Sequence, residues 1–226
     1  MSEEKDKKSN AGYLKVIGIL LLLLGILIVV YTFQPFIFSY IDYKFTPPPD
    51  KEIKVELAKG DEQITTEINQ DTQVVFVNNE FGLYIPKIQA NAKVIKNIDP
   101  YDYDAYHNAL ISGVAHAKGS AVPSESGNVF LFAHSAVNFY ERNKYDVYFY
   151  LINELKSDDE VFVSYEGVLY KYRVFEVKIV NKEDVKYLSN YSDRDTLTLM
   201  TCYPAGTDWK RTIVVAYRDS QLPSEK

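Results

Sequence analysis

The sequence predicts an all-β domain, closed or nearly closed into a barrel, that follows one membrane-spanning helix. Short β-type runs succeed one another from residue 74 to residue 218, and only two stretches have helical periodicity. The 19 tyrosines and 12 phenylalanines favour a β-rich domain, because aromatic side chains suit half-buried pleated surfaces. A long uncharged run near the start of the chain predicts the helix.

The length of 226 residues leaves room for one domain of about 140 residues with extensions. We expect a cytoplasmic segment over residues 1–15, a transmembrane anchor over 16–41, a stalk over 42–78 and the domain over 79–226. The formal net charge of −6 argues against a nucleic-acid partner, because phosphate binding requires a basic surface.

The apolar run contains no charged residue between Lys15 and Asp42. About 20 helical residues cross the ~30 Å hydrocarbon core of a bilayer, so the run predicts one transmembrane helix. Four aromatic residues near its end suit an interfacial belt: Tyr31, Phe33, Phe36 and Tyr40. The alternative is a cleaved signal peptide, but bulky residues occupy the place where its small-residue cleavage site would lie.

Lysines before the run predict its orientation. The positive-inside tendency places the N-terminus in the cytoplasm and the domain outside the plasma membrane, although Lys44 and Lys51 on the other flank make the asymmetry modest. The segment Thr46–Asp71 starts with prolines and is polar, which is typical of a stalk that lifts a domain off the membrane.

Strand patterns follow in order, over residues 74–77, 83–88, 92–95, 129–133, 160–180, 196–201 and 210–218. The run 129–133 is continuously apolar, as in a strand buried on both faces. The run 160–180 alternates around Glu166-Gly167 and predicts a hairpin. Helices are predicted only over Asp102–Leu110 and Tyr145–Leu155.

The only cysteine, Cys202, ends one β-type run, and Lys210 and Arg211 begin the next. Neighbouring positive charge favours the thiolate, which is the nucleophilic form of cysteine. A buried apolar cysteine is the alternative. One cysteine cannot form an intramolecular disulfide or a zinc site built on cysteine pairs, so we favour a free nucleophile in the oxidising exterior.

Three histidines compete for the role of general acid. His134 directly follows the apolar strand 129–133, where a side chain is held firmly at the rim and can still be reached by a substrate. His116 lies in a glycine-flanked loop and is the rival candidate. His107 falls within a predicted helix, where a solvated or capping role is expected.

Four segments in order resemble the sortase family. They are LYIPKI at 83–88, GVAHAKGSAVP at 113–123, GNVFLFAHS at 127–135, and TLMTC followed nine residues later by Arg211. The resemblance extends roughly from Phe81 to Arg218. It implies a closed eight-stranded barrel with one or two short helices and a site at one end.

The resemblance also implies a cysteine transpeptidase. Cys202 would attack a backbone carbonyl of a sorting-signal peptide, His134 would protonate the leaving amine, and Arg211 would stabilise the oxyanion or the substrate backbone. An amine acceptor, either a cell-wall precursor or a pilin lysine, would resolve the thioester. Three further residues are assigned to substrate binding: Thr201, His116 and Ser135. Of these, His116 is expected to form a wall of the site or to order its loop.

Two features bear on the subclass. Tyr203-Pro204 is similar to classes C, D and E, in which X-Pro follows the nucleophile. Asp99-Pro100-Tyr101 resembles the lid of the pilin class but follows the second barrel strand, so we interpret it as a turn. No cofactor or metal is implied; a Ca²⁺ ion that orders the acidic segment Glu183–Asp195 stays open as an alternative for which the sequence gives no support.

A second hypothesis is a membrane-anchored barrel that binds a cell-wall peptide or partner without turnover. Cys202 would then be a core residue, so thiol reactivity separates the two hypotheses. A cysteine transpeptidase that acts directly on peptidoglycan would need a His-Gly-Cys cluster near the nucleophile, and the sequence contains none.

Overall fold

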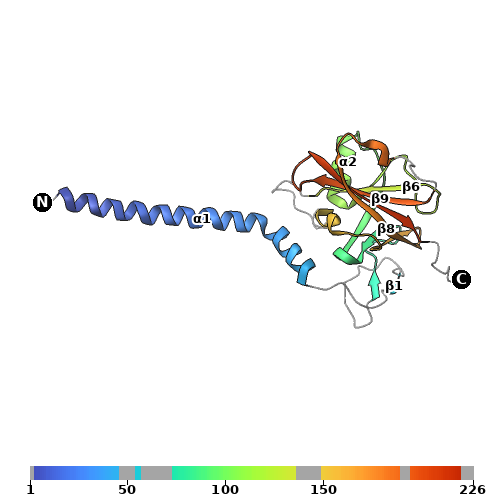
Figure 1. Cartoon of the computed structure of the whole chain (residues 1–226), viewed down its shortest axis with the longest axis horizontal. Coiled ribbons are helices and arrows are strands. Elements are labelled where there is room, and N and C mark those ends of the chain that lie inside the picture. The colour runs from blue at the N-terminus through green and yellow to red at the C-terminus, as the bar shows by residue number, and fades with distance from the viewer. Residues whose placement is uncertain (1–2, 46–53, 57–72, 136–148, 189–193, 220–226) are drawn as a thin grey trace. The chain divides into compact units, whose positions relative to one another are not determined.

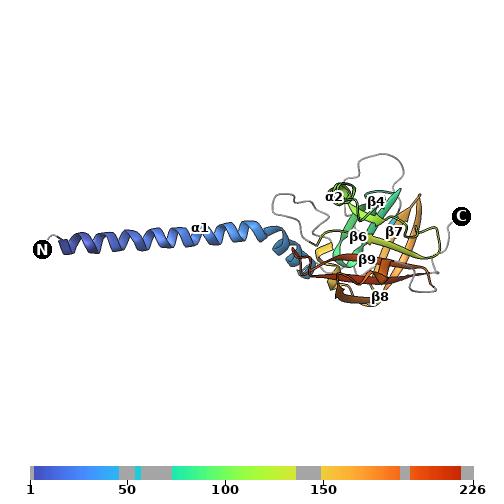
Figure 2. The ribbon, with the colours of Figure 1, turned by 90° about the horizontal axis from the view of Figure 1, so that it is seen from above.

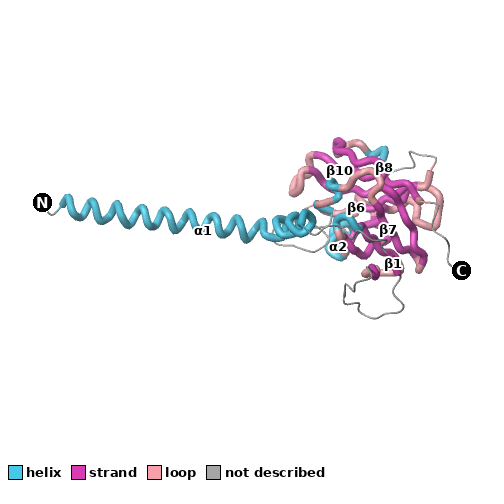
Figure 3. Tube along the Cα trace, turned by 60° about the horizontal axis from the view of Figure 1, so that its bottom comes forward, coloured by secondary structure: helices cyan, strands magenta, loops and turns pink. Residues whose placement is uncertain are grey.

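The computed structural model describes residues 3–45, 54–56, 73–135, 149–188 and 194–219. The chain divides into two compact units, Met1–Asp42 and Tyr43–Lys226. Helix α1 (Glu3–Phe45) accounts for the first unit, and strands make up most of the second (Figures 1 and 3).

Helix α1 contains the predicted anchor. Its segment Tyr13–Thr32 spans 20 residues, and none of its side chains is buried. By length and composition this segment could cross a membrane. Of the expected interfacial aromatics, Tyr31 and Tyr40 are exposed. The side chains of Phe33 and Phe36 lie outside the described part of the structure.

The predicted stalk is described only in part. Strands β1 (Lys54–Glu56) and β2 (Gln73–Val75) pair in parallel as a small separate sheet. Residues 46–53 and 57–72 lie outside the described residues. Phe76 is fully buried against Tyr84 and Phe162, so packing of the domain begins within the segment assigned to the stalk.

Eight strands close a barrel in the order β10-β8-β7-β3-β4-β5-β6-β9, which confirms the predicted all-β fold (Figure 2). The barrel strands are β3 (Phe81–Ile85), β4 (Ala90–Ile98), β5 (Val114–Ala117), β6 (Asn128–Phe132), β7 (Glu160–Tyr165), β8 (Val168–Asn181), β9 (Thr196–Tyr203) and β10 (Lys210–Arg218). The β7–β8 hairpin turns at Glu166 and Gly167, as predicted, and both residues have positive φ angles.

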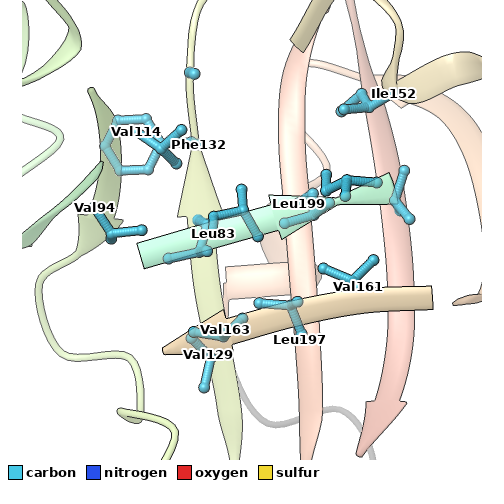
Figure 4. Close-up of a cluster of buried hydrophobic side chains, with 14 of the residues drawn as sticks. Leu83, Val94, Val114, Val129, Phe132, Ile152, Val161, Val163, Leu197 and Leu199 are labelled. Carbon is cyan, nitrogen blue, oxygen red and sulfur yellow. The ribbon is translucent and has the colours of Figure 1, made fainter. Parts of the chain in front are cut away.

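The barrel encloses the hydrophobic core. Figure 4 shows side chains from β3, β6, β7 and β9 meeting one another, among them Leu83, Leu197 and Leu199, all of which are fully buried. Because successive side chains of a strand point to opposite faces, Leu197 and Leu199 of β9 fix the inward face of that strand. Met200 and Cys202 therefore lie on its other face.

Within the barrel, two pairs of neighbouring strands are parallel, β4 with β5 and β6 with β9, and the other barrel pairs are antiparallel. These directions bring the carboxyl ends of β6 and β9 and the amino end of β10 to one end of the barrel, which we call the β9 end. The carboxyl ends of β4, β5 and β7 lie at the opposite end.

Helix α2 (Tyr103–Ser112) confirms the first predicted helix, and the side chain of Asp102 caps it by accepting the Ala105 N–H at 3.1 Å. Asp99-Pro100-Tyr101 forms the predicted turn, in which the Asp99 carboxylate accepts the Tyr101 N–H at 3.0 Å.

The second predicted helix, Tyr145–Leu155, is not continuous in its described part. Phe149 and Tyr150 are helical, a turn follows, and the 3₁₀ helix η2 (Ile152–Glu154) ends at an extended Leu155. Four closely spaced apolar residues are buried here, so burial within a turn and not helical periodicity accounts for the pattern: Phe149, Leu151, Ile152 and Leu155. Residues 145–148 lie outside the described residues.

The predicted strand 83–88 is also shorter than expected. Residues Pro86–Ile88 form the 3₁₀ helix η1, because proline cannot donate to a strand ladder. The strand predicted over 92–95 is longer than expected and becomes β4.

A buried amide network joins β6 to β9. Asn128, 1% exposed, accepts the hydroxyl hydrogens of Thr196 (2.9 Å) and Thr198 (2.8 Å) and donates to the carbonyl oxygen of Tyr187 (2.8 Å). This network lies at the start of both strands and fixes their register from one end.

We therefore predict that Asn128→Ala lowers the free energy of unfolding by about 2–4 kcal/mol, because buried polar partners lose their hydrogen bonds. Chemical denaturation of the wild type and the variant measures the difference. Asn108→Ala, on the exposed side of α2, is the control and should change stability by less than about 0.5 kcal/mol. An equal loss in both variants would contradict the role of the network.

Candidate active site

Cys202 and Arg211 face each other across the antiparallel strands β9 and β10. In the same register Lys210 lies opposite Tyr203, so the side chains of Lys210 and Arg211 point to different faces. Directly opposite residues have neighbouring side chains on one face. Both Cys202 and Arg211 are half-buried, which leaves them accessible at the β9 end of the barrel.

His134 reaches the same place from β6. This strand pairs in parallel with β9, with Phe132 beside Met200, and the Ala133 N–H donates to the Met200 carbonyl at 3.2 Å. Continuing that register by two residues places His134 beside Cys202. The structure therefore brings the three predicted catalytic residues to one end of the barrel, with Cys202 on β9, Arg211 on β10 and His134 two residues beyond the end of β6.

Tyr106 of α2 is a site residue that sequence reasoning missed. Its ring lies edge-on to His134, with ring centroids 5.6 Å apart, and stacks on Phe132 at 5.9 Å. Burial raises the pKa of Tyr106, Cys202 adds to the rise and Arg211 opposes it, so the phenol stays protonated beside both groups. A helix residue gives no sequence signal of such a contact, because the contact depends on how α2 packs against β6.

Opposing effects act on the Cys202 thiol. Burial raises its pKa above the ordinary value, the Arg211 guanidinium lowers it, and the Asp208 carboxylate raises it. Burial is the largest of the three, so the thiol is the resting form at neutral pH. Asp208, in the β9–β10 loop, is a second residue that the sequence analysis did not identify.

The Arg211 guanidinium is anchored to its own loop. Its Nη1 donates to the carbonyl oxygens of Asp208 at 3.1 Å and Lys210 at 3.0 Å. These bonds use one nitrogen of the planar fork, and the other donors can serve a ligand. The β9–β10 loop thus holds the cation beside Cys202.

Thr201 precedes Cys202 in the sequence, and Ser135 follows His134. Thr201 is buried, and its hydroxyl donates to the Ala133 carbonyl at 2.8 Å, which ties the residue before His134 to the residue before Cys202. Ser135 is 3% exposed, and its hydroxyl has no hydrogen-bond partner among the described residues. Both residues line a cavity of about 310 Å³ that borders Cys202.

His116 is placed elsewhere. It lies on β5, which runs toward the opposite end of the barrel, and it does not line the cavity beside Cys202. Its Nδ1 accepts the Asn97 N–H at 3.2 Å, so Nε2 carries the proton of the neutral ring and donates to the Ala121 carbonyl at 2.9 Å. Burial lowers the pKa of His116. The described contacts fit the loop-ordering role and bring no support for substrate binding.

Among the described residues, no group of three or more histidine, cysteine or acidic side chains could hold a metal ion. Part of the acidic segment Glu183–Asp195, residues 189–193, lies outside the described residues. His107 stacks on Tyr103 of the same helix at 5.6 Å.

Comparison with known proteins places this arrangement in a family. A model of the sortase domain matches residues 83–219, more than half of the chain. The chain is 30% identical over 139 residues to Sortase D of Bacillus subtilis (strain 168). That match covers 60% of this chain and 62% of Sortase D, so the chain spans less than two thirds of the relative's length.

Solved structures agree with the fold. Sortase A from Corynebacterium diphtheriae (lid mutant) is 25% identical with a TM-score of 0.53, over 66% of this chain and 74% of that one. Sortase C-1 from Actinomyces oris is 26% identical with a TM-score of 0.52, over 62% and 73% of the two chains.

The charges around Cys202 predict opposite effects of two substitutions on its reactivity. Asp208→Asn should lower the pKa of the thiol and speed its alkylation at neutral pH, whereas Arg211→Gln should raise the pKa and slow it. We expect changes of roughly two- to threefold, because Asp208 is exposed and Arg211 is half-buried, so water screens both charges. The rate of iodoacetamide alkylation against pH measures both. Changes in the same direction would contradict the assignment.

Proposed function

The chain belongs to the sortase family, and on that premise we propose that it is a cysteine transpeptidase whose catalytic residues are Cys202, His134 and Arg211. The observation that carries the proposal is the pairing of Cys202 with Arg211 across β9 and β10. A nucleophile, a proton donor and an oxyanion donor at one end of the barrel are the parts that acyl transfer from a peptide requires.

The first half of the reaction forms a thioester. The Cys202 thiolate attacks the backbone carbonyl of a sorting-signal peptide, and the Arg211 guanidinium donates to the negative charge that develops on the carbonyl oxygen. His134, as imidazolium, gives its proton to the departing amine, so the C–N bond breaks and the acyl group stays on sulfur.

The resting charge state limits this first step. With ordinary pKa values, a cysteine–histidine pair at pH 7 is in the thiolate–imidazolium form on the order of one percent of the time. Burial raises the pKa of Cys202 and reduces that fraction, and Arg211 partly restores it. We therefore expect slow turnover, with Arg211 acting on the nucleophile as well as on the oxyanion.

Tyr106 has a positioning role in this scheme. Its edge-on contact holds the His134 ring from the α2 side, and its stacking on Phe132 ties that contact to β6. A histidine that must give a proton on one side and take one back needs a fixed ring plane.

The second half of the reaction transfers the acyl group to an amine. The acceptor would be a cell-wall precursor or a pilin lysine, and the result would be a surface protein joined to the wall or one pilin subunit joined to another. Substrate and acceptor thus both lie outside the cell. This fits α1 as an uncleaved anchor, with residues 1–15 in the cytoplasm and the domain on the exterior of the plasma membrane.

The central test of the proposal is Cys202→Ala in the full-length chain in detergent micelles. Wild-type protein should cleave a sorting-signal peptide selected from a library and transfer it to an added amine, and mass spectrometry reads both products. The variant should lose cleavage and transfer with little change in melting temperature. Transfer above trace level by the variant would contradict Cys202 as the nucleophile. Absence of cleavage and transfer in the wild type as well would favour a barrel that binds peptide without turnover.

Arg211 and Lys210 provide a matched pair for the oxyanion donor. A planar fork donates two parallel bonds where an ammonium is a point donor, so Arg211→Lys should lower kcat/KM by about 10²–10³. Lys210→Ala should have a much smaller effect, because Lys210 lies opposite Tyr203 and not Cys202.

Melting temperatures of these two variants serve as the control, and both should stay close to the wild type, since neither residue is in the core. If kcat/KM were strongly lowered in Lys210→Ala and nearly unchanged in Arg211→Lys, Lys210 and not Arg211 would be the oxyanion donor.

A further inference from the structure

The cavity beside Cys202 has features that thioester formation does not use. It measures about 310 Å³, is open to solvent on one side, and is bordered by the end of β9, the start of its following loop, η2 and Ser135. Neither His134 nor Arg211 is among its lining residues. The described lining includes side chains with hydroxyl, amide and carboxylate groups: Ser135, Tyr150, Asn153, Glu154, Thr201 and Thr212.

Two lining side chains, Ser135 and Glu154, have hydrogen-bonding capacity that the described residues leave unused. Ser135 is 3% exposed, and its hydroxyl has no hydrogen-bond partner among the described residues. Glu154 is half-buried, and within the described part of the chain it makes no ion pair and accepts only a 3.3 Å bond from Asn153. A buried hydroxyl without a partner costs free energy unless a ligand satisfies it.

We propose that this cavity binds the primary ammonium group of the acyl acceptor. The inference rests on the proposed function and names the acceptor subsite of the same site. An ammonium group carries three donors and no acceptor, so it matches a carboxylate and a hydroxyl and would repel a cationic wall.

The location suits an incoming amine. That amine has to reach the thioester on Cys202 and then give a proton to His134. The cavity borders Cys202 itself and also Ser135, which is covalently joined to His134. The Thr201–Ala133 hydrogen bond of 2.8 Å holds the two chain segments together at this point.

In the transfer step the bound ammonium group loses one proton to water, and its nitrogen attacks the thioester carbonyl carbon. The new C–N bond forms as the C–S bond breaks, and the bonding pair leaves with the sulfur of Cys202. His134, neutral after protonating the first leaving amine, takes the second proton from the nitrogen. The thiolate–imidazolium pair is thereby restored.

The ratio of transfer to hydrolysis tests this site in the full-length chain in detergent micelles. The chain is supplied with a peptide that it cleaves and with increasing glycinamide, whose amine is largely protonated at neutral pH. Glu154→Gln should raise the glycinamide concentration that gives equal amounts of both products about tenfold, as expected for one charge-assisted hydrogen bond. Hydroxylamine, which is uncharged at neutral pH, should show no such shift.

Glu80→Gln is the matched control. Glu80 is exposed and lines a different cavity at the opposite end of the barrel, so its neutralisation should leave the product ratio unchanged. Ser135→Ala is the second variant. It should shift the glycinamide dependence in the same direction and leave the melting temperature within about 2 °C of the wild type, because no described protein bond is lost.

Three results would overturn the assignment. An unchanged glycinamide dependence in Glu154→Gln would show that the cavity does not bind the ammonium group. An equal shift with hydroxylamine would show that the charge of the amine plays no part. If Glu154→Gln lost peptide cleavage in the absence of amine to the same extent as transfer, the cavity would bind the donor peptide instead of the acceptor. Cleavage by the wild type without amine tests the proposed function and the product ratio tests the subsite, so the two failures are distinguishable.

Discussion

The parallel pairing of β6 with β9 is the constraint on which the candidate site depends. Cys202 and His134 are far apart in the chain and become neighbours only because the two strands run in the same direction in a fixed register. That register is fixed at both ends of the strands. Asn128 bonds two threonine hydroxyls at their start, and Thr201 bonds the Ala133 carbonyl near their end. A slip by one residue would turn the histidine to the other face.

Burial and the charge of Arg211 have opposite effects on the pKa of Cys202. Partial burial of Cys202 raises the pKa of its thiol. The guanidinium of Arg211 lowers that pKa. Because the β9–β10 loop carbonyls hold the guanidinium, its charge is applied at a fixed place. Preorganised charge of this kind needs no rearrangement when the oxyanion forms.

Much of the fold and of the site could be predicted from the sequence. The alternating and apolar runs predict the barrel, and the segments around His134, Cys202 and Arg211 predict which side chains meet. Periodicity could not separate a helix from a buried turn before Leu155, because both bury apolar residues at close spacing. The contact of Tyr106 with His134 depends on tertiary packing of α2, and no local pattern encodes it.

The chain order of the barrel has a consequence for when activity can arise. Strand β9 lies between β6 and β10, so these last two strands complete the closed sheet and also contribute Cys202 and Arg211 to the candidate site. Asn128 and Thr196 are 68 residues apart in the chain, and pairing at such separation is slow because a long loop has to close first. A chain that emerges from its N-terminus therefore does not bring Cys202 and Arg211 beside the end of β6 until β9 and β10 are both available.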